Sequence, residues 1–163
     1  MKIIFLDKDG VVNSDQYFDS ISGKNVSELE YDVDPKTIDL LEEIVKETGA
    51  KIVVTASARY TKGAKPFIDE LIRRNMYLDK TPLMHNIRGL EIKKWLVDHP
   101  GVEDFVILDD EIFESYDDKL LKKLVKTDGN GISFGKGLTS KEKDDVISRL
   151  GKTKEKDGEE RGE

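Results

Sequence analysis

Three short apolar runs constrain the fold of this 163-residue sequence more than any other feature. They cover residues 2–6, 51–55 and 104–108, and each is a nearly continuous series of apolar side chains rather than an alternation of apolar and polar ones. Such runs are typical of strands covered on both faces, as in parallel sheets. The sequence therefore predicts a parallel sheet with helices on both sides, a Rossmann-like three-layer α/β fold.

Helix signals lie between these runs. Asp34 is suited to an N-cap, Pro35 to the first helical position and Gly49 to a helix end, which together predict a helix between them. The apolar periodicity predicts two further helices, over about 66–74 and 89–98.

The C-terminal part of the domain is predicted to contain one more strand and one more helix. A short strand is expected at 124–127. A last helix is expected to begin at Thr139, because Glu142 three residues later completes a capping box.

Two segments depart from this alternation. Residues 14–33 are polar with scattered aromatic side chains, and we expect an inserted flap, a minimal cap, over one edge of the sheet. Residues 151–163 have no apolar side chain, which predicts a disordered charged tail. We therefore expect one domain over residues 1–150.

The composition excludes several classes of protein. Acidic residues outnumber basic ones by 34 to 27, so we expect no extended nucleic-acid surface. No apolar stretch approaches the length that spans a membrane. The chain has no cysteine, which excludes disulfides and thiolate metal sites and favours a cytoplasmic location. The oligomeric state is not defined by the sequence.

Polar residues follow each apolar run. These are Asp7, Asp9, Thr55, Asp109 and Asp110. Because the carboxyl ends of parallel strands meet at one edge, we expect these side chains to converge there. Crowded carboxylates repel one another unless a cation neutralises them, and oxygen ligands favour Mg²⁺. The metal would attract a phosphate, which one carboxylate could attack while another transfers protons.

Several segments resemble a known family. "FLDKDGVVN", "KIVVT" and "FVILDD" resemble the first, second and fourth motifs of haloacid dehalogenase (HAD) superfamily phosphatases. "RGLEIKKWL", "LVKTDGN" and "GLTSKEKDDVISRL" resemble the small HAD domains associated with RNA repair proteins. The resemblance extends to about Leu150.

The resemblance implies a role for each strand-end residue. Asp7 would be the nucleophile that becomes an aspartyl phosphate, and also a metal ligand. Asp9 would be the general acid and base, with its backbone carbonyl on the metal. Thr55 would donate a hydrogen bond to the phosphoryl group. Asp109 and Asp110 would complete the Mg²⁺ site, with Asp110 preferred as the direct ligand.

The resemblance also implies a basic residue before the acidic strand. Arg88 fits best because it opens the helix that leads into this strand, whereas Lys93 and Lys94 lie further inside the helix.

The turn after the second strand is implied to bind substrate through Ala56, Ser57 and Arg59. For Arg59 a surface position is the alternative. Repair-type domains tend to have S-S-W-R here, whereas this chain has "TASAR". This departure bears on the substrate more than on the chemistry.

These features predict an enzyme, a Mg²⁺-dependent phosphomonoesterase that works through an aspartyl phosphate. Its substrate would be a nucleotide, a small phosphorylated metabolite or a nucleic acid terminal phosphate. The alternative is a phosphorylatable receiver-like signalling or binding module without phosphatase turnover. Receivers accept phosphate on the third strand, whereas the D-x-D motif here follows the first, which favours the enzyme.

Overall fold

Five parallel strands form the centre of the structure, a computed structural model that describes residues 1–153. Their order is β3-β2-β1-β4-β5, and their bounds are β1 Lys2–Leu6, β2 Lys51–Val54, β3 Tyr77–Lys80, β4 Asp104–Asp109 and β5 Leu124–Lys126. Leu6 at the end of β1 pairs with Val54 on one side and with Leu108 on the other. The next residues along these strands, Asp7, Thr55 and Asp109, therefore lie at the same level of the same sheet edge.

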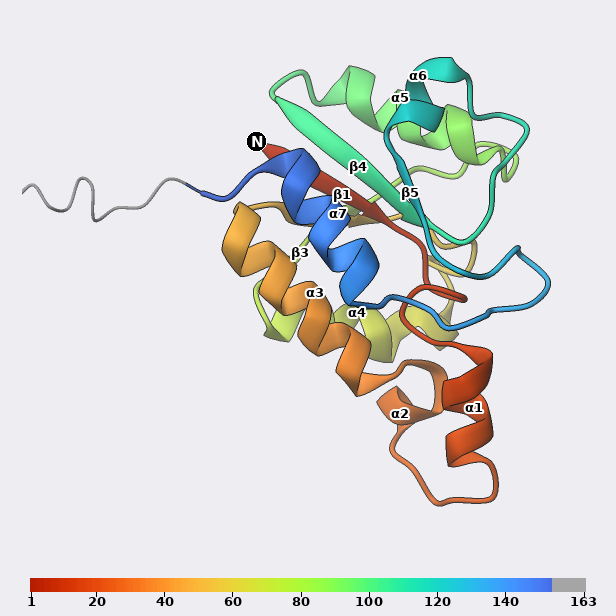
Figure 1. The fold of residues 1–163 in the computed structure, drawn as a ribbon. Coiled ribbons are helices and arrows are strands. Elements are labelled where there is room, and N and C mark those ends of the chain that lie inside the picture. The colour runs from red at the N-terminus through yellow and green to blue at the C-terminus, as the bar shows by residue number, and fades with distance from the viewer. Residues whose placement is uncertain (154–163) are drawn as a thin grey trace, which may run out of the picture.

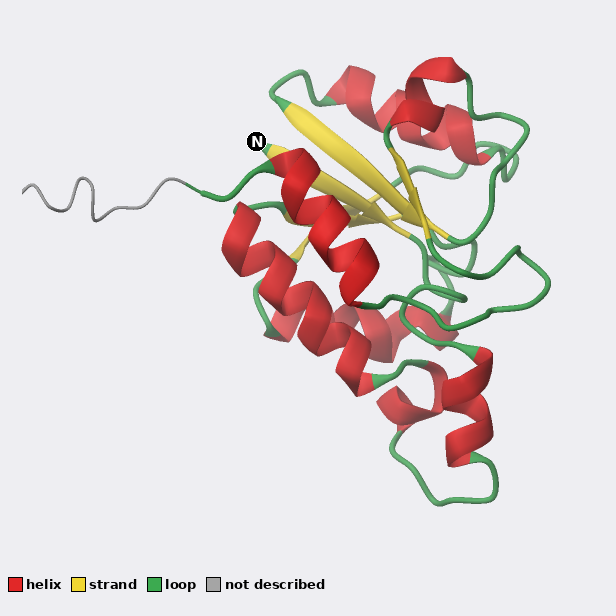
Figure 2. Ribbon diagram, viewed as in Figure 1, coloured by secondary structure: helices red, strands yellow, loops and turns green. Residues whose placement is uncertain are grey.

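Helices cover both faces of this sheet (Figures 1 and 2). One face carries α3 (Pro35–Thr48), α4 (Lys65–Arg73) and α7 (Ser140–Leu150), and the other carries α5 (Arg88–Asp98) and α6 (Asp118–Lys122). This arrangement confirms the predicted Rossmann-like α/β fold.

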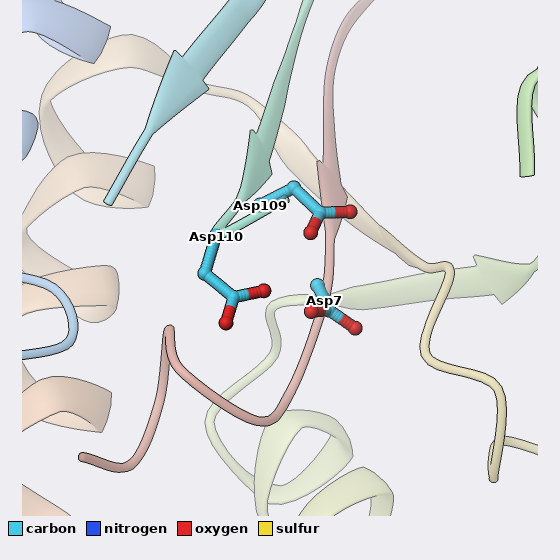
Figure 3. A group of neighbouring side chains, drawn as sticks. All are labelled: Asp7, Asp109 and Asp110. Carbon is cyan, nitrogen blue, oxygen red and sulfur yellow. The ribbon is translucent and has the colours of Figure 1, made fainter. Parts of the chain in front are cut away.

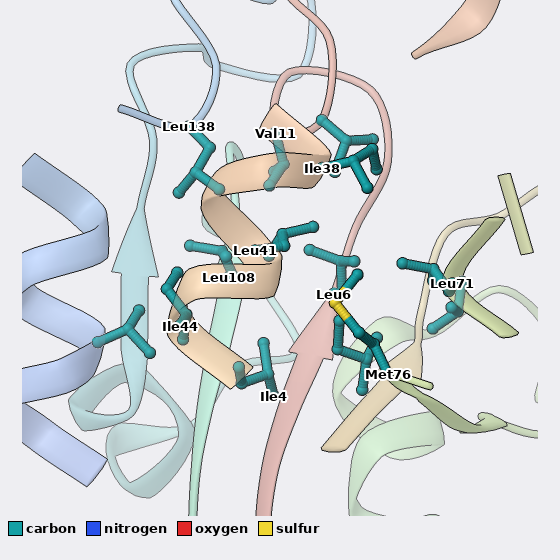
Figure 4. Packing of buried hydrophobic residues seen from close by; sticks show 14 of the residues in the cluster. Ile4, Leu6, Val11, Ile38, Leu41, Ile44, Leu71, Met76, Leu108 and Leu138 are labelled. Carbon is teal, nitrogen blue, oxygen red and sulfur yellow. The ribbon is translucent and has the colours of Figure 1, made fainter. Parts of the chain in front are cut away.

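The core divides along β1 as the pleat of a strand requires. Ile4 and Leu6 pack in the cluster under α3 (Figure 4), whereas Ile3 and Phe5 pack in the cluster under α5. Since both faces are covered, every position of this strand after Lys2 is buried. This double burial is the physical reason for the continuous apolar runs in the sequence.

The predicted helix ends agree with the structure. The side chain of Asp34 accepts a hydrogen bond from the Lys36 amide at 3.0 Å, and Pro35 opens α3. Gly49 ends this helix with a left-handed φ of 75°, which glycine adopts without steric cost. The capping box of Thr139 and Glu142 is present at the start of α7.

Short elements were missed by the sequence analysis. The strand β3 lies at the edge of the sheet and is only partly buried, so it has no continuous apolar run. The helix α6 and the 3₁₀ turn Lys62–Ala64 are too short to show a period.

The segment predicted as a flap contains two short helices, α1 (Asp15–Ile21) and α2 (Glu28–Asp32). The two lie at one end of the molecule, beside the start of α3 (Figure 1). The buried Tyr17 holds them together, because its hydroxyl donates to the carbonyl of Glu30. Of the predicted tail, residues 154–163 lie outside the described residues.

Candidate active site

Three carboxylates meet at the carboxyl edge of the sheet. Asp7 follows β1, Asp109 is the last residue of β4, and Asp110 follows it. One oxygen from each lies within 4.8 Å of the others, and all three side chains are buried. Figure 3 shows them pointing toward one another from the two neighbouring strands. We call these three residues the aspartate cluster.

Among the described residues, one cation contacts this cluster. Arg88, the first residue of α5, lies 2.7 Å from Oδ2 of Asp109 and 3.6 Å from Oδ1 of Asp7 through its Nη1. Burial raises the pKa of both Asp7 and Asp109 above the ordinary carboxyl range, and the Arg88 guanidinium opposes this shift. A single guanidinium cannot balance three carboxylates, so the cluster suits a further cation.

The donor atoms of the cluster fit a hard divalent ion. All three groups are carboxylates, and oxygen ligands are those that Mg²⁺ prefers. Asp109 is already engaged, because it also accepts from the Glu111 amide at 3.1 Å and from the Tyr116 hydroxyl at 3.3 Å. Asp110 accepts only from the Gly131 amide, at 3.3 Å, among the described residues. Its second oxygen therefore remains open for a ligand.

Thr55 adds an unsatisfied donor. Its backbone amide continues the sheet by donating to the carbonyl of Leu6 at 2.8 Å. Its side chain is fully buried, and Oγ1 has no hydrogen-bond partner within residues 1–153. A buried hydroxyl without a partner is unfavourable by about 1–3 kcal/mol, so a ligand oxygen at this position would be stabilised.

Asp9 is set apart from the cluster. Its Oδ1 accepts hydrogen bonds from Asn13 Nδ2 at 2.8 Å and from Lys8 Nζ at 3.3 Å. Within the described part of the chain its Oδ2 accepts none. The carboxylate is therefore held at one oxygen and free at the other, a geometry suited to proton transfer.

Asn13 was missed by the sequence analysis, although it stands four residues after Asp9 in the first motif. It is fully buried and satisfied, since Oδ1 accepts from the Gly10 amide at 2.9 Å and Nδ2 also donates to the carbonyl of Asp32 at 2.7 Å. One side-chain amide thus connects Asp9, the Gly10 turn and the end of the flap.

A pocket of about 370 Å³ opens over these groups. It is lined by predicted residues from three strand ends and from α5, namely Asp7, Asp9, Ala56, Ser57, Arg88 and Asp110. Lys8, Glu111, Phe113 and Phe134 line it too and were not predicted as site residues. The last three lie in loops that give no periodic signal.

Arg59 is not part of this pocket. Its side chain is 1% exposed, so the surface position expected as an alternative is wrong. Its guanidinium donates to the carbonyls of Thr81 at 2.8 Å and Pro82 at 2.7 Å, and it pairs with Glu91 at 3.2 Å. Because its donors are used inside the protein, the structure does not bring Arg59 to the substrate position.

The three basic residues considered for the position before the acidic strand have different surroundings. Arg88 reaches the aspartate cluster, whereas Lys93 pairs with Asp117 at 2.5 Å and Lys94 with Asp98 at 3.1 Å. The structure therefore brings only Arg88 to the site.

Fold and site together define a class: parallel α/β domains with an acidic site at the carboxyl ends of the central strands. A family model described as the HAD domain in Swiss Army Knife RNA repair proteins matches residues 3–142. The chain belongs to this family, whose members are broadly phosphatase-type hydrolases. Neither the search of curated proteins nor that of solved structures returned a match.

None of the helices in residues 1–153 is long and apolar enough to cross a membrane.

Proposed function

We propose that this protein is a Mg²⁺-dependent phosphomonoesterase that works through an aspartyl phosphate on Asp7. The observation that carries the proposal is the aspartate cluster beside the unpartnered hydroxyl of Thr55. The cluster would hold a cation, and the hydroxyl would hold a phosphoryl oxygen.

The metal ligands would be Asp7, Asp110 and the backbone carbonyl of Asp9, with Asp109 supporting them. When bound, Mg²⁺ would neutralise the carboxylates and lower the repulsion between them and an anionic substrate. Without it, five acidic residues line or underlie the pocket, and Lys8 and Arg88 are the basic residues that face them. This balance would repel a phosphate.

The first half of the reaction uses two aspartates. A carboxylate oxygen of Asp7 forms a bond to phosphorus as the bond from phosphorus to the leaving oxygen breaks. Oδ2 of Asp9 gives its proton to that leaving oxygen. Thr55 Oγ1 donates to a phosphoryl oxygen, which satisfies the buried hydroxyl.

The second half reverses the role of Asp9. Its carboxylate takes a proton from water, and the water oxygen bonds to phosphorus as the bond from phosphorus to Asp7 breaks. Inorganic phosphate leaves, and both aspartates return to their starting states.

The substrate that we favour is a terminal phosphate on a nucleic acid, because the matching family is that of HAD domains in RNA repair proteins. A nucleotide and a small phosphorylated metabolite are the other candidates. The net charge of −7 argues for contacts near the phosphate rather than along an extended strand.

The test is phosphate release from RNA and DNA oligonucleotides phosphorylated at the 5′ or the 3′ end, from nucleoside monophosphates and from sugar phosphates. We expect release that requires Mg²⁺, stops with chelator and is absent in Asp7→Asn. A stable phosphoprotein without release would support the receiver-like alternative instead. If no substrate gave either phosphate release or a phosphoprotein, the proposal would be contradicted.

A further inference from the structure

Two phenylalanine rings line the pocket, and the proposed reaction uses neither. Phe113 has a structural explanation, because the Arg88 guanidinium lies over its ring at 4.5 Å and Tyr116 packs against it with 5.4 Å between ring centroids. It supports the position of Arg88. The Phe134 ring packs against the flap instead of against these catalytic groups, so it needs a separate explanation.

The backbone around Phe134 is held in place. It lies in residues 127–139, which connect β5 to α7. Asp15 of the flap accepts hydrogen bonds through Oδ2 from Ser133 Oγ at 2.8 Å, from the Phe134 amide at 3.1 Å and from the Gly135 amide at 3.3 Å. The Asp15 amide donates in return to the Gly135 carbonyl at 3.2 Å. Four hydrogen bonds thus fix a segment with no regular structure.

The ring itself has a partner on one side. Phe18 of α1 packs against Phe134 with 6.1 Å between centroids and a tilt of 57°. Phe134 is half-buried and also lines the pocket over the aspartate cluster. An aromatic ring supported in this way, beside the charged residues of the pocket, presents an apolar surface to a ligand.

A flat aromatic group is the ligand that this surface suits. Aromatic rings in proteins stack on nucleobases, and this stacking tolerates any base sequence. The pocket volume of about 370 Å³ lies in the range of small-molecule sites. The phosphate would occupy its acidic end, and the base its aromatic wall.

We propose that Phe134 is the stacking platform for the nucleobase next to the phosphate that is removed. This inference rests on the proposed function for the phosphate position, and it adds the part of the substrate that the protein recognises. Asp15 is then a positioning residue, because it fixes the segment that carries the ring.

The first experiment compares oligonucleotides that carry a terminal phosphate on a normal residue or on an abasic residue. Phe134→Leu keeps an apolar side chain but loses the ring, Phe134→Tyr keeps the ring, and Ile132→Ala on the same segment is the control because Ile132 is 92% exposed. We expect Phe134→Leu to raise KM for the normal end by about 5-fold or more and to leave the abasic end unchanged. Phe134→Tyr and Ile132→Ala should behave as the wild type.

The second experiment measures binding without turnover. In the Asp7→Asn background, AMP and ribose 5-phosphate are titrated in the presence of Mg²⁺, with and without Phe134→Leu. If Phe134→Leu weakens the binding of AMP but not that of ribose 5-phosphate, the platform is supported. This holds even when no substrate is hydrolysed, an outcome that would contradict the proposed function separately. If Phe134→Leu does not fold, Phe134→Trp replaces it. AMP should then quench the fluorescence of the introduced tryptophan.

Equal effects of Phe134→Leu on normal and abasic ends would overturn the platform while leaving the phosphatase proposal intact. The platform is equally overturned if AMP binding is unchanged by Phe134→Leu, or if AMP fails to quench Phe134→Trp. These outcomes would give Phe134 a packing role against Phe18 only.

Discussion

Two aspartates separated by one residue have opposite surroundings. Asp7 is buried against Arg88 and the rest of the aspartate cluster, whereas the Asp9 side chain is 55% exposed and is held at Oδ1 by Lys8 and Asn13. A buried carboxylate near a cation site suits a nucleophile, and a carboxylate with one free oxygen at the mouth suits a proton donor. The difference in environment therefore supports the different roles that we propose for Asp7 and Asp9.

The first prediction separates these roles by substitution. Asp7→Asn should abolish turnover and the phosphoryl adduct, since an amide is a poor nucleophile. Asp9→Asn should lose much more activity on alkyl than on aryl phosphates, because general acid catalysis contributes about 10²–10⁴ in rate and a good leaving group needs little of it. Mass spectrometry of quenched protein locates the adduct. An undiminished adduct in Asp7→Asn would place the nucleophile elsewhere.

The second prediction concerns Asn13, which positions Asp9. Asn13→Ala removes the donor to Asp9 and leaves the buried Gly10 amide without its acceptor, which should lower stability by about 1–3 kcal/mol. We expect the alkyl-to-aryl rate ratio to fall in the same direction as in Asp9→Asn, but less. Denaturant unfolding and the rate ratio measure the two effects separately. A loss of stability with an unchanged ratio would restrict Asn13 to a structural role.

The third prediction concerns Gly10, whose φ is +82°. A Cβ at this position would lie 2.1 Å from Oδ2 of Asp110, so Gly10→Ala must displace either the turn or this carboxylate. We expect weaker Mg²⁺ binding, measured by calorimetry. Gly101→Ala is the matched control, because a Cβ there meets no atom within 4 Å. Equal Mg²⁺ affinity in both variants would contradict the close approach seen in the structure.

Residues at strand ends could be predicted from the sequence, and residues held by distant contacts could not. Asp7 and Asp109 are placed by the strands before them, and these strands are visible in the sequence as apolar runs. The surroundings of Arg59 depend on carbonyls more than twenty residues away and on Glu91. The place of Phe134 likewise depends on Asp15, 119 positions earlier in the chain. No local pattern reports such contacts.

At the scale of elements, the flap and the sheet contribute different residues to the candidate site. The sheet edge carries the aspartate cluster, while α1 and α2 are held to each other by Tyr17 and reach the site through Asn13, Asp15 and Phe18. The flap therefore contacts the residues that orient Asp9, the proposed proton donor, and Phe134, the proposed stacking platform. It contributes none of the carboxylates in the cluster.

The fourth prediction follows from this division. Replacing residues 17–30 by a short Gly/Ser linker removes Phe18 but retains Asn13, Asp15 and Asp32. We expect hydrolysis of nitrophenyl phosphate to persist, while the preference for nucleotides over sugar phosphates declines. Relative kcat/KM values measure this preference, and circular dichroism confirms the fold. Loss of turnover on nitrophenyl phosphate in a folded variant would mean that the flap supplies catalytic groups.

At the scale of the whole molecule, the aspartate cluster exists only in the folded chain. Asp7 and Asp109 are 102 positions apart by the numbering and meet because β1 and β4 are neighbours in the sheet. A ligand that binds only the folded state stabilises it, by about 2.7 kcal/mol at a concentration one hundred times its Kd. Mg²⁺ should therefore raise the melting temperature.

The fifth prediction uses two variants to separate this effect from general stability. Asp110→Asn removes one of the crowded charges, so the metal-free protein should melt at a higher temperature than the wild type, while the rise caused by Mg²⁺ should largely vanish. Leu41→Ala, which opens a cavity in the buried cluster under α3, should lower stability by about 2–5 kcal/mol and retain the Mg²⁺-dependent rise. Thermal melts with Mg²⁺ and with chelator measure both. A full Mg²⁺-dependent rise in Asp110→Asn would show that the ion binds outside the aspartate cluster, because the loss of a direct ligand cannot leave its affinity unchanged.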